Sequence, residues 1–315
     1  MEKIRLGISS CLLGEPVRFD GGHKLDRYLV HTLGRYVEWI PVCPEVEFGL
    51  PTPRESLRLV DGENGTRLVF GKSGTDITSE MQAWAANRVR ELESELLCGF
   101  VFKSKSPSSG MERVKLYDRN GVPKKSGVGL FAAAFMKHFP LLPVEEDGRL
   151  HDPRLRENFI ESVFTLQRWR QAIGEQATSG KVVDFHSRHK LLLLAHSPAL
   201  YREMGQLVAR SGTLPVHALV DSYQPLLLKA LRLQTTPSKH LNVLQHMLGY
   251  FKQQLSGDEK LEALDLFARY RRGELPLVVP LTLVGHFVRK YRQPYLAQQY
   301  YLVPHPLELQ LRNHV

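Results

Sequence analysis

Hydrophobic positions follow two different patterns along this chain. In the first half, short apolar runs alternate with segments whose apolar residues recur every three or four positions, the first typical of buried strands and the second of helices. We predict strands at residues 4–9, 37–42, 66–70 and 99–103 and helices at residues 24–36, 76–97 and 130–138. Strands that alternate with helices favour a Rossmann-like α/β domain with a mostly parallel sheet.

The second half carries helical periodicity almost throughout, with few β-branched runs. We predict helices at residues 153–172, 179–195, 199–211, 214–235, 238–255, 257–272 and 280–291. These make an all-α C-terminal domain. Proline, acidic residues and glycine interrupt both patterns at residues 143–148, so we divide the chain there into domains 1–147 and 148–315.

Composition indicates an ordinary globular protein. The chain has 315 residues, of which 43% are hydrophobic and 24% charged, which excludes a disordered chain. It contains no run of about 18 apolar residues, so we expect no membrane-spanning helix. The first residues lack the apolar core of a signal peptide, and we therefore expect a cytoplasmic location. The sequence leaves the oligomeric state open.

The positive charge is concentrated in the second half. The whole chain has a formal charge of +9, whereas residues 151–315 hold 21 basic and 13 acidic residues, a net charge of +8. Ten of the 13 histidines also lie there, so we expect mild acidification to raise this charge. This excess of positive charge favours an anionic partner, such as a nucleic acid. The alternative is charge that serves only solubility.

Three unusual loops follow predicted strands, at residues 9–14, 43–46 and 104–110. Because ligands bind at the carboxyl edge of an open α/β sheet, we expect these loops to meet there. Cys11 and Cys43 are candidate ligands of an iron–sulfur cluster or zinc, which thiolates favour. The alternative is that both are small buried hydrophobic residues. Cys98 precedes the strand at residues 99–103, on the opposite edge, and we predict a core position for it.

Polar side chains in these loops suit proton transfer. Glu45 follows Cys43 closely and is a candidate general base, or else a carboxylate that caps a nearby amide. Ser106, Ser108 and Ser109 offer hydroxyls for a proton relay, although serine-rich segments are often plain turns. The loop from Asp20 to Lys24 either closes over a ligand or forms a turn.

The first half contains an ordered set of motifs: ISSCLLG at residues 8–14, VRFDG at 17–21, CPEV at 43–46, TPRE at 52–55, GTDIT at 74–78 and KSKSPS at 103–108. Together they are similar to the motifs of the thiouracil desulfurase family. The second half resembles the helical domain often fused to this family, through HSRHK at 186–190, AHSP at 195–198 and NVLQH at 242–246. The chain most resembles the two-domain form that acts as a tRNA 4-thiouridine desulfidase.

This resemblance implies a specific chemistry. Family members hold a 4Fe–4S cluster on three cysteines, and the open iron takes the sulfur of a thiolated pyrimidine while water replaces it, giving an oxo base and hydrogen sulfide. Cys11 and Cys43 match two of the cluster ligands, Glu45 the proton-transfer carboxylate and Ser106 its serine partner. The matching substrate-loop residues are Asp20, Lys24, Arg54, Lys103 and Ser108. The implied partner is tRNA that contains 4-thiouridine, whose phosphates would meet the basic helical half.

One position departs from the family pattern, because Ser109 stands where the family has its third cysteine. A serine hydroxyl is a harder and less acidic ligand than a thiol and should hold iron poorly. Cys98 cannot readily replace it, since a strand of roughly 15 Å separates the two positions. Three explanations remain open: an engineered change, which the intact neighbouring motifs favour, a natural loss of catalysis, or weak ligation by serine. In each case we expect the cluster to be absent or partial.

Basic residues in the helical half are the candidate RNA contacts. They are Arg188, Lys190, Arg271, Arg272, Arg289 and Lys290. The alternative is that these side chains form solvated helix faces. Tyrosines at positions 270, 291, 295, 300 and 301 interleave with the last two groups, and such rings can stack on unpaired bases. Two other functions stay open: a desulfurase of free thiouracil or a thionucleoside, and an RNA-binding protein without catalysis.

Overall fold

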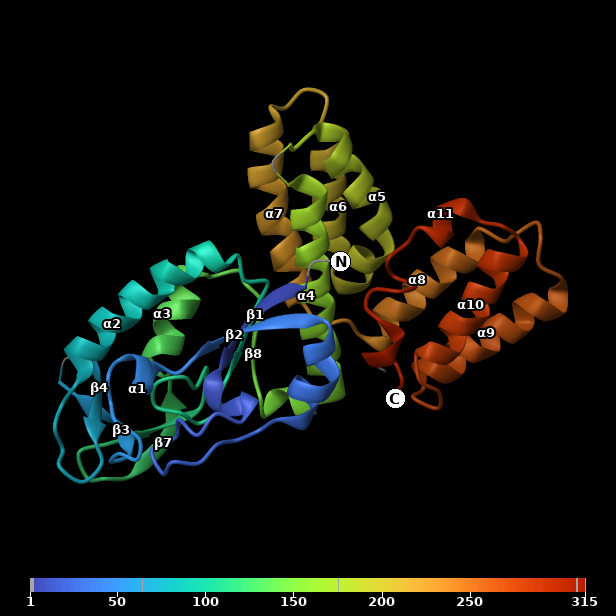
Figure 1. Cartoon of the computed structure of the whole chain (residues 1–315). Coiled ribbons are helices and arrows are strands. Elements are labelled where there is room, and N and C mark those ends of the chain that lie inside the picture. The colour runs from blue at the N-terminus through green and yellow to red at the C-terminus, as the bar shows by residue number, and fades with distance from the viewer. Residues whose placement is uncertain (1–2, 64, 175, 310, 315) are drawn as a thin grey trace. The chain divides into compact units, whose positions relative to one another are not determined.

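A computed structural model describes residues 3–63, 65–174, 176–309 and 311–314 (Figure 1). The chain forms two compact units, Met1–His151 and Asp152–Val315. The first unit is an α/β structure and the second is helical, as the hydrophobic pattern predicts.

The main sheet of the first unit has four parallel strands in the order β2–β1–β5–β8. Their bounds are Ile4–Ser9 for β1, Val37–Val42 for β2, Phe100–Phe102 for β5 and Val144–Glu146 for β8. Four consecutive residues of β1, from Leu6 to Ser9, are buried, as expected for a central strand covered on both faces. At Gly7 a Cβ atom would lie 2.1 Å from the ring of Phe100, so β1 can approach β5 only with glycine there.

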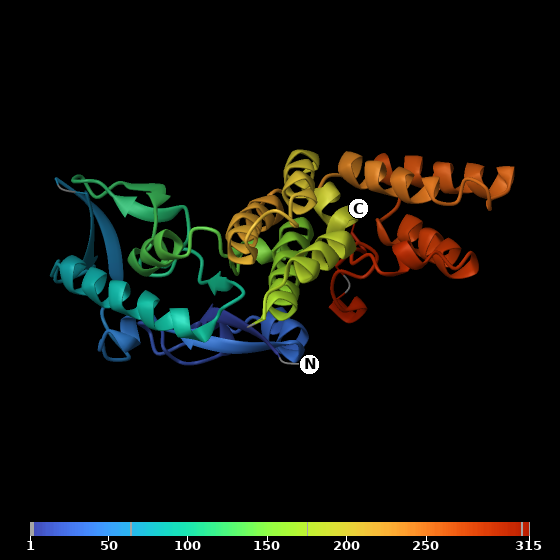
Figure 2. The same cartoon turned by 90° about the horizontal axis from the view of Figure 1, so that it is seen from above.

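Two helices pack side by side in this unit, α2 (Thr78–Glu91) and α3 (Leu130–His138) (Figures 1 and 2). Aromatic rings join α3 to the sheet: the ring centroids of Phe100 and Phe102 are 4.4 Å apart, and that of Phe135 lies 4.8 Å from Phe100. All three side chains are fully buried. This apolar packing fixes strand β5, and with it the start of the serine-rich loop that follows.

A second sheet has the order β4–β3–β6–β7. Its strands are β3 (Leu57–Gly62), β4 (Gly65–Phe70), β6 (Val114–Tyr117) and β7 (Pro123–Gly127). The hydrophobic pattern predicts only β4. The other strands escape it because few of their side chains are buried: in β7 only the terminal Gly127 is.

Two further predictions for the first unit are wrong. Residues 24–36 form no continuous helix but a short π-helical turn at Tyr28–Thr32 and a 3-10 turn at Leu33–Arg35. The stretch at residues 143–148 is not an irregular junction, because β8 pairs there with β5. Cys98 is fully buried and its N–H donates to the carbonyl of Arg5 at 2.8 Å, so its predicted core position is confirmed.

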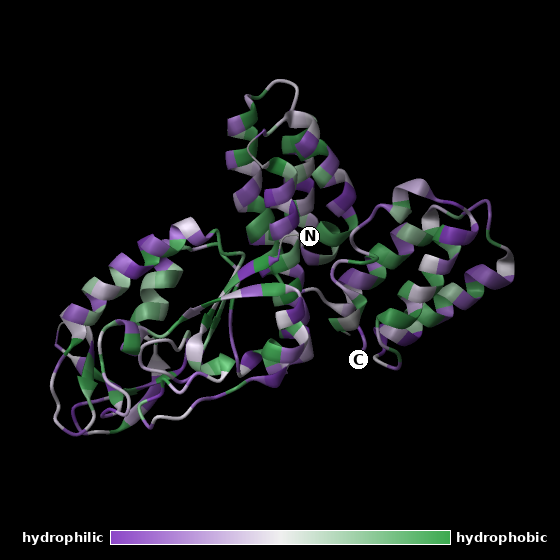
Figure 3. Cartoon of the chain, viewed as in Figure 1, coloured by the Kyte–Doolittle hydropathy of each residue, from purple (hydrophilic) through white to green (hydrophobic). Residues whose placement is uncertain are grey.

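The second unit contains all seven predicted helices, with ends shifted by a few residues, and the short α11 that the pattern missed. They are α4 (Pro153–Ile173), α5 (Ser179–His196), α6 (Pro198–Ala209), α7 (Val216–Arg232), α8 (Pro237–Gly249), α9 (Gly257–Arg271), α10 (Val278–Lys290) and α11 (Pro294–Ala297). Hydrophobic and hydrophilic residues alternate along these helices, as amphipathic packing requires (Figure 3). Among the described residues, no helix is both long and apolar enough to span a bilayer.

Four histidines of the helical unit are held in the neutral form by burial. Burial lowers the pKa of His186 to about 4, that of His240 to about 3 and that of His305 to about 4. His189, beside Arg168, also has a pKa well below its ordinary value, mainly because of burial. The expectation that mild acidification charges the histidines of this half is therefore wrong for these four side chains.

Candidate functional site

A cavity of about 500 Å³ lies in the first unit, where strands β1, β2 and β5 end. The three loops expected to meet at this edge all contribute to it. Cys11 comes from the 3-10 turn Ser10–Leu13 after β1, and Cys43 directly precedes the short helix α1 (Pro44–Glu47) after β2. Ser106 and Ser109 come from the loop after β5.

Both cysteines are free and largely buried in the cavity wall. Burial raises the pKa of Cys11 to about 11, against the opposing charge of Lys103. Burial also raises the pKa of Cys43 to about 12, and the nearby Glu45 carboxylate adds to this effect. Both thiols are therefore protonated at neutral pH, and binding of a metal would have to displace their protons.

Glu45 is in direct contact with Ser108, one of the three serines that the sequence offers for a proton relay, whereas the family resemblance implies Ser106 as its partner. Its Oε1 accepts a hydrogen bond from Ser108 Oγ at 2.6 Å, and Ser108 Oγ lies 3.0 Å from Ser106 Oγ. Glu45 Oε2 lies 3.7 Å from Cys43 Sγ on its other side. A carboxylate and two hydroxyls thus form a continuous path for a proton, from Glu45 through the fully buried Ser108 to Ser106, which also lines the cavity.

The backbone around these serines is held tightly. The N–H groups of Ser108 and Ser109 both donate to Ser106 Oγ, at 3.3 and 3.1 Å. The carbonyl of Ser108 accepts from the N–H of Phe131, in the first turn of α3, at 2.9 Å. Lys105 takes a left-handed conformation, with φ of 62°, to start the turn. The hydroxyls are therefore preorganised relative to Glu45.

Glu146 anchors the end of the same loop. Its Oε1 accepts from the N–H of Met111 at 2.7 Å and from that of Glu112 at 3.3 Å, although the residue itself belongs to β8. The hydrophobic pattern does not identify Glu146, because it predicts a junction and not a strand at residues 143–148.

The predicted substrate-loop residues divide into two groups. Lys24, Arg54 and Lys103 line the cavity, whereas Asp20 is exposed and Ser108 lies behind Glu45, so neither faces it. The roles of these five residues and of the predicted ligands stay predictions. Asp20 is instead 3.4 Å from Arg18, itself a cavity residue that sequence reasoning missed.

Two contacts fix Lys103, one to Ser9 on β1 and one to Asp147, directly after β8. Its Nζ lies 2.7 Å from Asp147 Oδ2, and its backbone N–H donates to Ser9 Oγ at 2.9 Å. Asp147 follows β8 directly, so the carboxyl end of that strand would have identified it had the strand been predicted. The pKa of Asp147 is lowered: the hydrogen bond from Lys103 and the charge of that lysine outweigh the raising effect of burial.

The donors around the cavity do not match a cluster site with three thiolates. Cys11, Cys43 and the hydroxyl of Ser109 line it, and the chain's third cysteine, Cys98, is buried at the start of β5. Within the described ranges, no group of three or more histidine, cysteine or carboxylate side chains is placed to hold a metal ion. Two thiols and an alcohol are a poor set for a 4Fe–4S cluster, which is normally held by thiolates.

The candidate RNA contacts of the helical unit differ in availability. Arg188 pairs with Asp184, Arg272 with Glu274 and Lys290 with Glu259, each within the unit. Among the described residues, the side chains of Arg271, Arg289 and Lys190 have no hydrogen-bond or ion-pair partner. These three are the freer cations.

Most of the interleaved tyrosines do not offer a free ring. Tyr270 and Tyr301 are buried, and Tyr300 lies beneath the guanidinium of Arg168, at 4.2 Å. Tyr295 is stacked on Tyr250, with centroids 5.4 Å apart, and Tyr250 is exposed. The exposed ring of this group is thus Tyr250, which the pattern did not single out.

Comparisons with known proteins agree with this organisation. A family model described as 2-thiouracil desulfurase matches residues 6–147, and one described as a protein of unknown function (DUF1722) matches residues 190–306. The uncharacterised protein YbgA of Escherichia coli K12 is 31% identical over 166 residues, which are 51% of this chain and 95% of that protein. The uncharacterised protein YbbK of Bacillus subtilis 168 is 30% identical over 108 residues, 33% of this chain and 71% of that protein.

Among solved structures, the [4Fe-4S]-dependent thiouracil desulfidase TudS is 32% identical, covering 48% of this chain and 95% of its own, with a TM-score of 0.39. The match of residues 6–147 coincides with the unit that holds the cavity, and both curated relatives are covered over most of their length. The chain therefore belongs to the 2-thiouracil desulfurase family.

Proposed function

We propose that this chain is a desulfidase of thiolated pyrimidines, and that its substrate is 4-thiouridine in tRNA. The observation that carries the proposal is the convergence of Cys11, Cys43, Glu45 and Ser109 on one cavity, with Glu45 hydrogen-bonded to Ser108. Membership of the 2-thiouracil desulfurase family supports the reaction class.

In the overall reaction, the C=S group of the pyrimidine exchanges its sulfur for the oxygen of water and releases hydrogen sulfide, without net oxidation or reduction. Glu45 accepts a proton from the attacking water, and the Glu45–Ser108–Ser106 path returns it to the sulfur, which takes up both protons of the water and leaves as hydrogen sulfide as the C=O bond forms. Lys24, Arg54 and Lys103 contribute positive charge to the cavity wall. This positive charge stabilises the negative charge that accumulates on the departing sulfur.

Position 109 decides whether this form is active. Because two thiols and a hydroxyl do not make a three-thiolate set, we propose that the chain holds a 4Fe–4S cluster incompletely and that its desulfidation is weak. A cysteine at position 109 would supply the missing thiolate.

The helical unit is the proposed tRNA-binding part. Residues 151–315 carry a net charge of +8, and Arg271, Arg289 and Lys190 have no partner among the described residues. Contacts with phosphates would make the affinity for tRNA fall steeply between about 50 and 200 mM salt. A salt-independent affinity would contradict this part of the proposal.

Two alternatives have specific support. The family description names 2-thiouracil, which favours a free base as substrate. The serine at position 109 favours an RNA-binding protein without catalysis.

One experiment separates the three functions. The chain and its Ser109→Cys variant are reconstituted anaerobically with iron and sulfide, and each is assayed on tRNA containing 4-thiouridine, on free 4-thiouridine and on 2-thiouracil. We expect the variant to bind more iron and to release sulfide fastest from tRNA. Faster turnover of a free base would assign the activity to small substrates. Absence of turnover from a fully reconstituted variant, with tRNA still bound, would leave the non-catalytic function.

A further inference from the structure

A second cavity, of about 280 Å³, lies within the helical unit, and the proposed desulfidation makes no use of it. Its walls come from the start of α4, the link between α7 and α8, the end of α9 and the C-terminal segment. The residues that matter for its chemistry are Arg154, Glu157, Thr236, Tyr270, Arg271 and His314. Its volume is close to the lower end of the range for small-molecule sites and leaves room for more than a single inorganic anion.

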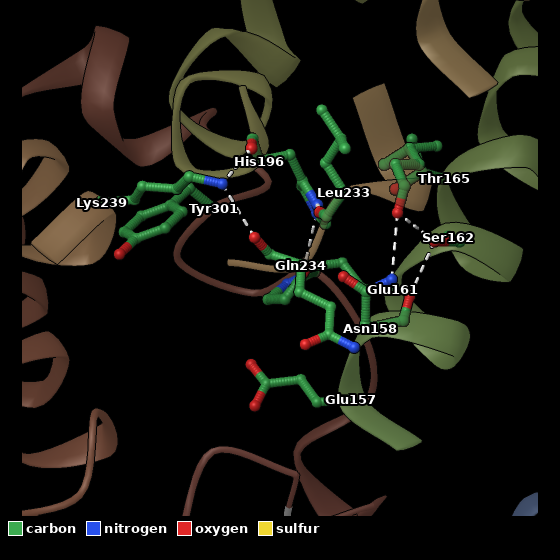
Figure 4. Close-up of polar contacts among 12 residues, drawn as sticks. Glu157, Asn158, Glu161, Ser162, Thr165, His196, Leu233, Gln234, Lys239 and Tyr301 are labelled. Carbon is green, nitrogen blue, oxygen red and sulfur yellow. Dashed lines mark hydrogen bonds and ion pairs between the residues drawn. The ribbon is translucent and has the colours of Figure 1, made fainter. Parts of the chain in front are cut away.

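One wall of this cavity is rigid. Lys239 Nζ donates to the carbonyls of His196 and Gln234, at 2.7 and 2.9 Å, and His196 Nδ1 lies 2.7 Å from the carbonyl of Leu233 (Figure 4). Asn158 Nδ2 on α4 donates to the carbonyl of Leu231 at 3.0 Å. The segment that leads into α8 is thus fixed before any ligand arrives, which reduces the entropic cost of binding.

The floor of the cavity carries a buried carboxylate. The side chain of Glu157 is 8% exposed, and its Oε1 lies 3.2 Å from Arg312 Nε. Arg312 is shared with Glu161, whose Oε1 lies 3.0 Å from Arg312 Nη2, so one guanidinium serves two carboxylates. Glu157 Oε2 lies 2.9 Å from His314 Nε2, so each oxygen of the carboxylate has one partner. Each oxygen keeps a second acceptor position, which a ligand group that donates hydrogen bonds would fill.

A tyrosine hydroxyl in the cavity lacks a partner. Tyr270 is 8% exposed and lines the cavity. Its ring packs edge-on against His240, at 6.2 Å between centroids, but among the described residues its hydroxyl makes no hydrogen bond. Unlike the hydroxyl of Tyr28, it is not closed off from solvent, so it is open to the cavity and available to a ligand.

The rim of the cavity is cationic. Arg154 and Arg271 are exposed, and within the described part of the chain neither guanidinium has an ion-pair or hydrogen-bond partner. The neighbouring Arg272 differs, because it pairs with Glu274. Two uncompensated guanidinium groups at a cavity mouth suit a phosphate, which arginine binds through paired N–H groups.

We propose that this cavity binds a phosphorylated nucleoside, with its phosphate on Arg154 and Arg271 and its hydrogen-bond donors on the carboxylate of Glu157. The hydroxyl of Tyr270 contacts the same nucleoside. A free nucleotide and the terminal nucleotide of an RNA offer this chemistry equally, and the site rests on the proposed function only in naming RNA as one source.

Calorimetric titration of the full chain tests the proposal. The ligands are the four 5′-nucleoside monophosphates, inorganic phosphate, and a short oligoribonucleotide with either a 5′-phosphate or a 5′-hydroxyl. We expect at least one mononucleotide to bind about tenfold more tightly than inorganic phosphate, and Arg271→Gln and Tyr270→Phe each to weaken it about tenfold. Arg202→Gln is the matched control, since it removes an equal charge from α6, outside the cavity.

The outcomes are distinct. Tighter binding of the 5′-phosphorylated oligonucleotide than of its 5′-hydroxyl form assigns the site to an RNA end, whereas exclusion of the oligonucleotide assigns it to free nucleotides; both support the proposal. Equal affinity for phosphate and mononucleotides, or equal losses in the Arg202→Gln control, would overturn it. Because no titrant contains a thiolated base, the result does not depend on whether the first unit desulfidates one.

Discussion

Ser108 Oγ lies 2.6 Å from Glu45 Oε1, although 63 positions separate the two residues in the sequence. The resemblance to the family assigns the serine partner of this carboxylate to Ser106, but in the structure Ser106 reaches Glu45 only through Ser108. Ser106 also accepts hydrogen bonds from two backbone N–H groups of its own loop. The two serines therefore have different tasks, one in direct contact with the carboxylate and one in shaping the loop.

This difference leads to a prediction for the Ser109→Cys form. Ser108→Ala should lower the desulfidation rate by roughly a hundredfold at unchanged iron content, because it removes the hydroxyl next to Glu45. Ser106→Ala should lower the rate and, in addition, the melting temperature, because the N–H groups of Ser108 and Ser109 lose their acceptor. Sulfide release and iron content are measured together. The exposed Ser126→Ala, on β7, is the control, and a Ser108→Ala variant with full activity would exclude the relay.

The carboxyl-edge rule for parallel sheets was enough to predict that the Cys11, Cys43 and Ser109 loops would meet. Strands β1 and β5 were predictable because their apolar runs are buried, and β2 because its run is apolar although only Val37 and Val42 are buried. Strands β3, β6 and β7 expose too many polar side chains to show a pattern. The contact between Ser108 and Glu45 depends on the left-handed turn at Lys105 and on capping by α3, which no spacing encodes. Likewise, Glu146 could be identified only once β8 was known to be a strand.

Glu146 provides a prediction about the stability of the serine loop. Glu146→Ala should reduce the free energy of unfolding of the first unit by about 2 kcal/mol, because a buried carboxylate that accepts two backbone N–H groups is lost. Glu146→Gln keeps an oxygen acceptor and should cost less. Hydrogen exchange at the amides of Met111 and Glu112 measures the effect locally. If Glu146→Ala leaves both amides as protected as before, the carboxylate does not anchor the loop.

Ser256 and Glu259 form a capping box at the start of α9, and this contact gives a prediction of pH dependence. Lys290, through a 2.7 Å contact, and the N–H of Ser256 lower the pKa of Glu259 to about 2. Because the pKa in the folded chain is depressed, the stabilisation is present above the ordinary carboxyl pKa and is lost as pH falls toward 2. Lys290→Met should move the pKa of Glu259 upward in an NMR titration. An unchanged pKa in this variant would show that the ion pair does not form in solution.

The shared guanidinium of Arg312 gives the last prediction. Its Nε and Nη2 hold Glu157 and Glu161, and all three side chains are at least nine-tenths buried. Arg312→Gln should destabilise the helical unit by about 3–5 kcal/mol, because two buried carboxylates lose their counter-charge. The exposed pair formed by Arg188 and Asp184 is the matched control, and Arg188→Gln should cost less than about 1 kcal/mol. Adding Glu157→Gln to Arg312→Gln should recover part of the loss in urea unfolding, since it removes one unpaired charge. If the second substitution recovers nothing, the cost comes from packing of the C-terminal segment and not from the charges.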